Sequence, residues 1–273
     1  MVAVFNQENF YMELDRLFQT GDALAIEAFL LQQGDLAKES GDNAGIIAVN
    51  NELGGIWRAQ GKYDEARYLY EQILSMMIDA GLQDSVHYAT ALLNTGDVYL
   101  AQDQYDSADR YFNEADRLYR RLGYAEAYPM AALYNNRSVA ARQQGRYAEA
   151  RQLLVQALAI IEQVPEAVAE VGTSLLNIGQ LDLLTGNLAE AKTHLEQALA
   201  RYAALPQGRD IHQGQAFHAL AQVYDQLGDY YQAQAYAQKA LEALARDFGS
   251  NHPAYKDLEA FQQQIAEKAG EGK

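Results

Sequence analysis

The chain lacks cysteine and is poor in proline and in long apolar runs. Because none of its 273 residues is Cys, a disulfide framework, a Cys-based zinc site and a Cys nucleophile are excluded. No apolar stretch reaches the roughly 18 residues that a membrane-spanning helix needs, and the N-terminus lacks the pattern of a secretory signal. We therefore expect a soluble, cytoplasmic protein with no membrane partner.

Positive charge is also scarce. Lys and Arg total 21 against 37 Asp and Glu, which gives a formal net charge of -16 and a pI near 4.6. Such a surface repels phosphate backbones and anionic lipid. Nucleic acid is therefore excluded as an expected partner.

Motifs for catalysis, metal binding and cofactor binding are absent as well. None of the five His belongs to an HExxH helix, and the sequence contains no GxxxxGK[ST], no GxSxG and no GxGxxG after a strand. Its acidic residues are scattered over predicted helix faces beside Arg and Lys, which is typical of a solvated surface. We expect no catalytic residues, no metal, no cofactor and no enzymatic activity.

What the sequence does contain is an internal repeat. The stretch LGGIWRAQGKYDEA, Leu53 to Ala66, returns 42 residues later as TGDVYLAQDQYDSA, Thr95 to Ala108. Further copies start at Arg137, Ile178 and Leu220, and a weaker one precedes them near the N-terminus. A period of this length marks stacked helical or mixed units that bury their apolar faces against their neighbours.

Each copy has the same order of residue types. A small residue is followed seven positions later by a breaker, and an Ala comes after that. The small residues are Gly54, Gly96, Ser138, Gly179 and Ala221; the breakers are Gly61, Asp103, Gly145, Gly186 and Gly228; the Ala are Ala66, Ala108, Ala150, Ala191 and Ala233. Gly can adopt the left-handed conformation that ends a helix, and small side chains let helices approach closely. The pattern therefore predicts two helices per repeat, joined at the breaker.

This pattern resembles the tetratricopeptide repeat in its long form of about 42 residues, as in kinesin light chains and in bacterial regulators and scaffolds. The segments GKYDEARYLYEQIL (61–74) and FGSNHPAY (248–255) are close to that form. The resemblance implies an all-α, right-handed α-solenoid of about six helix-turn-helix repeats in a single domain, 1–273. The predicted repeats span about 4–43, 44–86, 87–128, 129–168, 169–210 and 211–249, with a C-terminal capping helix at 252–268.

One periodic feature does not follow from packing. Two residues before the small position stand Asn94, Asn136 and Asn177, although Asn is a mediocre helix former. In the resembling family, the first of the two helices of each repeat, called here the first helix, lines the concave face. Asn at this position often holds the backbone of a bound peptide. Alternatively, these amides bond to neighbouring helices and stiffen the array. Glu52 and Ala219 replace Asn in the second and sixth repeats.

The same face, at the groove positions of the family, supplies further candidates for peptide contact. Together with the three periodic Asn they are Asn51, Arg58, Asp97, Asn135, Arg142, Gln180, His218 and Gln222. The two Arg are expected to favour an acidic side chain of the ligand. The Lys-rich clamp with which some family members hold a C-terminal carboxylate is absent.

The leading hypothesis is a non-enzymatic module that binds an extended peptide or protein segment in its concave groove. One alternative is a peptide-sensing regulatory receptor, although residues 1–43 are too short for the effector domain that such receptors usually carry. Another is a repeat domain of a larger signalling protein.

Overall fold

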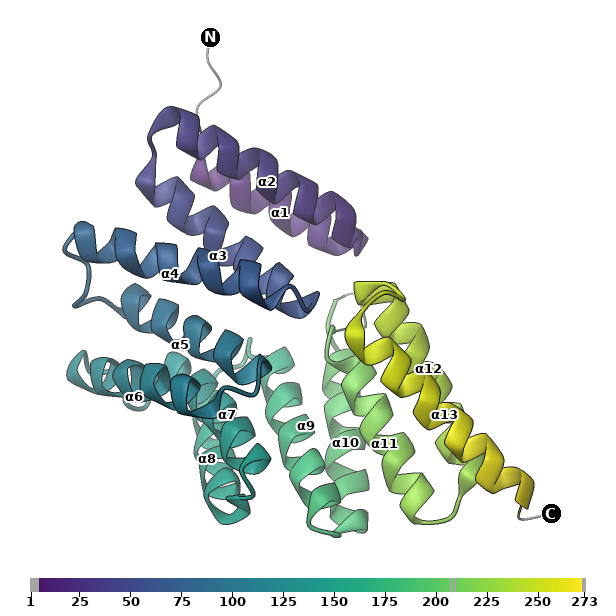
Figure 1. Cartoon of the computed structure of the whole chain (residues 1–273). Coiled ribbons are helices and arrows are strands. Elements are labelled where there is room, and N and C mark those ends of the chain that lie inside the picture. Colours follow the sequence, from purple (N-terminus) through teal and green to yellow (C-terminus); the bar gives the residue numbers. More distant parts are fainter. Residues whose placement is uncertain (1–4, 207, 209, 272–273) are drawn as a thin grey trace. The chain divides into compact units, whose positions relative to one another are not determined.

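The protein is all-α, as predicted. The computed structural model describes residues 5–206, 208 and 210–271, and within them it contains thirteen helices and no strand (Figure 1). The helices are α1 (Gln7–Thr20), α2 (Ala23–Ser40), α3 (Asn43–Ala59), α4 (Tyr63–Asp79), α5 (Val86–Ala101), α6 (Tyr105–Arg121), α7 (Tyr128–Gln143), α8 (Tyr147–Ile161), α9 (Val168–Leu184), α10 (Leu188–Ala203), α11 (Gln213–Gln226), α12 (Tyr230–Phe248) and α13 (Pro253–Glu271). None of these helices is long and apolar enough to cross a membrane.

Some of the predicted boundaries fall outside the described residues. The first repeat was expected to begin at residue 4, and the single domain to include residues 1–3, 207, 209, 272 and 273; none of these is described. The capping helix, expected at 252–268, is α13, which runs from Pro253 to Glu271.

The chain divides into two compact parts. The N-terminal half, Met1–Ala125, holds α1 to α6, and the C-terminal half, Glu126–Lys273, holds α7 to α13. Within each half, successive helices pack antiparallel as pairs, and first helices of neighbouring pairs also touch: α3 with α5, α7 with α9 and α9 with α11. Within each half, first helices of neighbouring pairs therefore lie side by side.

The breakers end the first helix of each pair in the predicted way. Gly145 has φ 74°, and Asp103 is the single described residue other than Gly with positive φ, at 57°. The Asp103 carboxylate accepts a hydrogen bond of 2.6 Å from the Tyr105 hydroxyl. Asp is among the few side chains tolerated in the left-handed region, and this local bond adds to that tolerance.

The small residues lie where two helices of one pair meet. A Cβ added at Gly96 would be 2.5 Å from the Phe112 ring, and one added at Gly179 would be 2.7 Å from Leu195. Ala108 and Ala150, in the second helices, are fully buried. The predicted close approach of the paired helices is confirmed, because no larger side chain fits there without a shift.

Candidate functional site on the first helices

In the N-terminal half, the side chain of Asn94 is hydrogen-bonded within the protein. The Asn94 amide on α5 donates to the side-chain oxygen of Asn51 on α3 at 2.9 Å, and the Asn51 amide donates to Glu52 at 3.2 Å. These bonds tie two neighbouring first helices together. At Asn94 the structure thus has the stiffening arrangement that the sequence left open.

Charged groups surround the same pair of helices. The Tyr70 hydroxyl, on α4, donates to the backbone carbonyl of Asn51 at 3.2 Å, and the charges of Arg58 and Asp97 both act on it. Burial raises the pKa of the Tyr70 hydroxyl well above its usual range. Burial likewise raises the pKa of the Glu52 carboxyl, and the bond from Asn51 offsets part of that shift. This part of the first-helix face is mixed in charge and already hydrogen-bonded internally.

In the C-terminal half, the three candidate Asn side chains have different surroundings. Asn135 is 6% exposed, donates to the Ser174 hydroxyl at 2.7 Å and accepts from it at 3.0 Å, so its amide joins α7 to α9. Asn136 and Asn177 are half-buried, and within the described residues their side chains have no hydrogen bond. The amides of Asn136 and Asn177 thus differ from that of Asn135, which is hydrogen-bonded between two helices.

Three of the predicted residues come together in one concavity of the C-terminal half. Arg142 on α7, Gln180 on α9 and Gln222 on α11 line it, and its volume is about 560 Å³. We call it the inner hollow; its other lining residues are Gln143, Leu183, Leu184, Gly186, Asp225, Gln226 and Phe261. Arg142 donates to the side-chain oxygen of Gln180, and burial lowers the pKa of its guanidinium. Within the described chain no carboxylate pairs with Arg142.

The capping helix α13 contributes to one side of the inner hollow through Phe261. This contribution was not predicted from the sequence. Lys268 on α13 contacts both carboxylate oxygens of Asp225 at 2.7 Å, and the Phe261 ring lies 5.2 Å from that of His218. Burial lowers the pKa of His218, a predicted ligand contact that here lies beside Phe261. A sequence signal existed, since Phe261 stands 42 residues after Ala219 and so continues the Asn position by one period.

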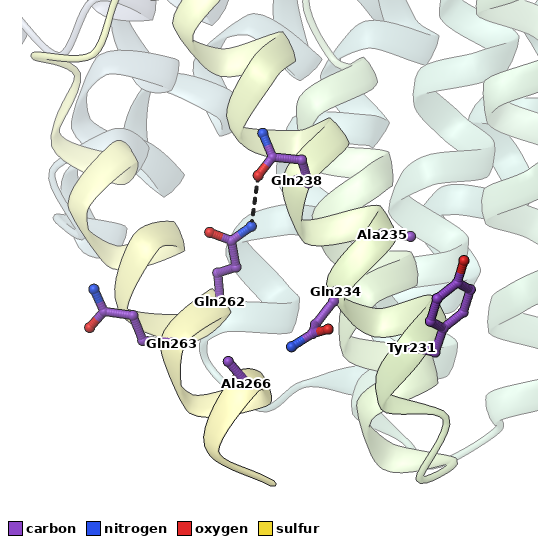
Figure 2. A pocket seen from close by; sticks show the side chains of 7 residues that line it. All are labelled: Tyr231, Gln234, Ala235, Gln238, Gln262, Gln263 and Ala266. Carbon is purple, nitrogen blue, oxygen red and sulfur yellow. Dashed lines mark hydrogen bonds between the residues drawn. The ribbon is translucent and has the colours of Figure 1, made fainter. Parts of the chain in front are cut away.

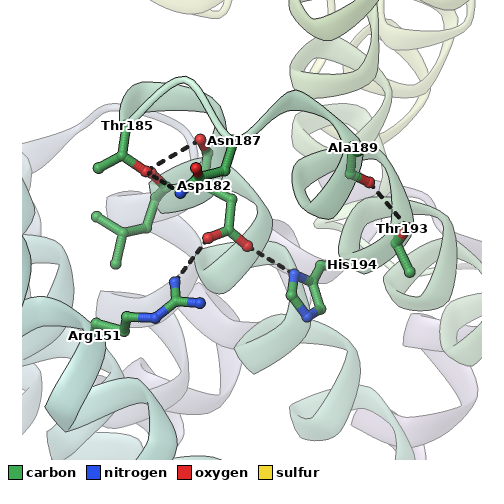
Figure 3. Close-up of polar contacts among 8 residues, drawn as sticks. Arg151, Asp182, Thr185, Asn187, Ala189, Thr193 and His194 are labelled. Atoms are coloured by element: carbon green, nitrogen blue, oxygen red, sulfur yellow. Dashed lines mark hydrogen bonds and ion pairs between the residues drawn. The ribbon is translucent and has the colours of Figure 1, made fainter.

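A second polar cluster, also unforeseen, lies away from the inner hollow. Asp182 on α9 is fully buried, and its carboxylate lies between Arg151 of α8 and His194 of α10, each at 2.7 Å (Figure 3). Both partners reach solvent, and Thr185 and Asn187 hydrogen-bond to each other in the turn that follows. The cluster links three helices, and its one sequence signal is an Asp inside the apolar run of α9 (181–184).

A second concavity, of about 440 Å³, lies between α12 and α13 (Figure 2). Its walls are mostly amides and alanines, and Gln262 donates to Gln238 across it at 2.9 Å. Gln263, also in its wall, stands 42 residues after Ala221 and is exposed. A long polar residue thus takes the small position in α13, so this side of the helix is polar and lacks the close-packing site of the earlier pairs.

Comparisons with known proteins agree on the repeat. A sequence model of the tetratricopeptide repeat matches residues 45–121 and 129–204, and a second such model matches 214–243. No curated protein sequence matches the chain.

Solved structures share the fold at low sequence identity. NprR in complex with its cognate peptide NprX is 17% identical, with a TM-score of 0.75 over 98% of this chain and 76% of that chain. A Rap protein complexed with competence and sporulation factor is 14% identical, with a TM-score of 0.67 over 95% and 75% of the two chains. The TPR-like repeats of a candidate kinesin light chain from Podosopora anserina are 21% identical, with a TM-score of 0.51 over 73% and 95%.

Proposed function

Since the chain belongs to the tetratricopeptide repeat family, we propose that it is a non-enzymatic interaction module that holds an extended peptide segment along its first helices. The observation that carries the proposal is the pair Asn136 and Asn177. Both are half-buried, both stand at one position of the repeat, and neither is hydrogen-bonded within the described residues. Because both side chains are partly exposed and use no hydrogen-bonding group within the described residues, their amides can bond to the backbone of a ligand.

The spacing of the first helices suits an extended ligand. Packed helices lie about 8–10 Å apart, and an extended chain rises about 3.3 Å per residue. One amide per first helix therefore meets about every third ligand residue. Each amide can donate to a carbonyl and accept from an N–H, which matches the two groups of a peptide bond.

The proposed contact set differs between the halves. In the C-terminal half it consists of Asn136, Asn177 and the inner hollow residues Arg142, Gln180 and Gln222. In the N-terminal half, Arg58 and Asp97 remain candidates. The amides of Asn51, Asn94 and Asn135 are used in bonds between or along first helices, and His218 lies beside Phe261, so we assign these four to packing.

The test uses a phage library of random dodecapeptides selected on the full chain, followed by fluorescence polarisation with labelled synthetic copies of the recovered peptides. The Asn136→Ala, Asn177→Ala double variant should bind them more weakly by about 1–3 kcal/mol in total, at 0.5–1.5 kcal/mol for each lost neutral bond. Its melting temperature should not fall, because Ala is the better helix former.

Asn94→Ala is the matched control. It stands at the same repeat position, but its amide already bonds to Asn51. It should lower stability and leave peptide affinity unchanged. Failure to recover any peptide above a blank support, or equal effects of the control and the double variant on affinity, would refute the proposal.

A second candidate function is that of a peptide-sensing regulator, and the likeness to NprR over nearly the whole chain favours it. In that case the recovered peptide should change the set of proteins that the chain captures from a lysate. A plain scaffold would capture the same set with and without the peptide. A role as the repeat domain of a larger signalling protein is compatible with either function.

Two further parts of the proposal concern context. We propose that the six repeats and the capping helix form one solenoid domain, and that the protein acts in the cytoplasm, where a chain without cysteine needs no disulfide.

A further inference from the structure

The inner hollow is lined by one acidic side chain, Asp225, and one basic side chain, Arg142, and only Asp225 has an ion-pair partner within the described residues. Asp225 is neutralised, since Lys268 of α13 lies 2.7 Å from both of its carboxylate oxygens. Arg142 has one hydrogen-bond partner, the neutral side chain of Gln180, and within the described residues it forms no ion pair. No other Asp, Glu, Lys, Arg or His is among the residues that line the hollow.

The remaining charge of the hollow is therefore positive, on a protein whose net charge is -16. Burial lowers the pKa of Arg142, and the hydrogen-bond partner of its guanidinium is the neutral side chain of Gln180. An Arg guanidinium nevertheless stays charged, and its fork of N–H donors fits a carboxylate through two parallel bonds. A carboxylate entering the hollow would be met by this fork and by the amides of Gln180 and Gln222.

We propose that the inner hollow binds a carboxylate side chain of the ligand at Arg142, and that the capping helix sets this selectivity through Lys268, which neutralises Asp225. The inference rests on the proposed peptide-binding function and adds to it the ligand chemistry and the residue that controls it. Without Lys268, the Asp225 carboxylate is left facing the same hollow as the incoming carboxylate, and the two repel each other.

The geometry of the Lys268–Asp225 pair makes this control separable from folding. The Lys268 side chain is 46% exposed and comes from the last helix of the chain, so replacing it leaves the packing of α7, α9 and α11 in place. Lys268 is not itself among the residues that line the hollow, and its ammonium group contacts both carboxylate oxygens of Asp225, which does line it.

The experiment selects random dodecapeptides on phage with five forms of the full chain: wild type, Arg142→Gln, Lys268→Met, Lys268→Met with Asp225→Asn, and Arg201→Gln. Arg201 is an exposed Arg of α10 outside the hollow and provides the matched control. Each recovered acidic peptide is then synthesised with a fluorophore and an amidated C-terminus, beside a copy in which the acidic residue is replaced by its amide. Circular dichroism melts establish that all five forms are folded.

Wild type and Arg201→Gln should enrich Asp or Glu at one peptide position and should bind the acidic peptide about tenfold or more above its amide copy, as expected for a charge-assisted bond. Arg142→Gln should abolish this preference, and Lys268→Met should reduce it severalfold. Asp225→Asn in the Lys268→Met background should restore it, because the carboxylate that Lys268 neutralised is then gone.

Two different failures are distinguishable. Peptides that bind without any acidic preference, or with a preference that Arg142→Gln leaves intact, overturn the inference and leave the peptide-binding function standing. A preference that Lys268→Met leaves intact overturns the role of the capping helix. If no form recovers peptides above a blank support, the proposed function fails, and the inference fails with it.

Discussion

Replacing Gly96 by Ala tests the close helix approach on which the repeat depends. The new Cβ would lie 2.5 Å and 2.7 Å from two carbons of the Phe112 ring, where carbon atoms in contact are normally about 3.5–4.0 Å apart. Phe112 is fully buried, so its ring cannot swing into solvent. Overpacking of this kind costs about 1–3 kcal/mol, while the change from Gly to Ala inside a helix contributes about 1 kcal/mol. The net loss should be about 0–2 kcal/mol.

The chain offers a matched control in Gly34. This glycine is also buried within a helix of the N-terminal half, but the nearest atom to its added Cβ is Val49 Cγ1 at 3.5 Å, an ordinary contact. Gly34→Ala should therefore stabilise the protein by about 1 kcal/mol. The difference between the two variants, about 1–3 kcal/mol, isolates the clash with Phe112.

Urea denaturation followed by circular dichroism measures both variants. Adding Phe112→Leu to the Gly96→Ala protein should recover stability, so that the two substitutions couple favourably in a double-mutant cycle. If Gly96→Ala raises the urea midpoint as much as Gly34→Ala does, the small residue is not required by helix approach, and our account of the repeat is wrong.

The remaining predictions concern packing, the buried ion cluster and nucleic acid. Ala108→Leu and Ala150→Leu should each lower stability by about 1–3 kcal/mol in urea melts, because both residues are fully buried in a helix crossing; unchanged midpoints would show that these crossings are loose. Removing both partners of Asp182, with Arg151→Ala and His194→Ala, should cost about 3–5 kcal/mol, because an unpaired carboxylate stays buried; Asp182→Leu should cost less, and the reverse order would contradict this. Gel shifts with duplex DNA at physiological salt should show no complex, since the chain carries a net charge of -16; salt-sensitive micromolar binding would overturn that expectation.

The sequence alone was sufficient for the helices and their breaks. Gly145 and Asp103 recur at one position of a long repeat, and the left-handed conformation needed there restricts the residue type to a few. Small residues such as Gly96 are equally readable, because close helix packing has no alternative solution at that position. Periodicity is a strong signal wherever one physical requirement recurs in every repeat.

The state of each Asn amide could not be read in this way. Asn94 and Asn177 stand at the same position of the repeat, yet Asn94 bonds to Asn51 of the neighbouring first helix. The corresponding neighbour of Asn177 is Asn135, whose amide is already paired with Ser174, so Asn177 is left without a partner among the described residues. Whether an Asn amide is hydrogen-bonded depends on which other groups compete for it and for its partner. The repeat pattern gives the residue type at each position but not the outcome of that competition.

The role of α13 was also beyond the pattern. Lys268 and Asp225 are 43 residues apart, which is also the separation of Asn94 and Asn51, so the repeat places the two side chains near each other. The repeat does not specify their residue types, however, because no earlier pair of first helices has opposite charges at these two positions, and the ion pair could therefore not be predicted from the pattern.

The central claim is that the amides of Asn136 and Asn177 hold the backbone of a ligand. The most direct measurement is a two-dimensional ¹⁵N NMR spectrum of side-chain amides, recorded before and after saturation with a peptide recovered by phage selection and assigned with the Asn136→Ala and Asn177→Ala variants. Our account predicts that the Asn136 and Asn177 side-chain signals move, while the buried Asn135 signal stays in place. Saturation of the protein with neither signal moving would contradict it.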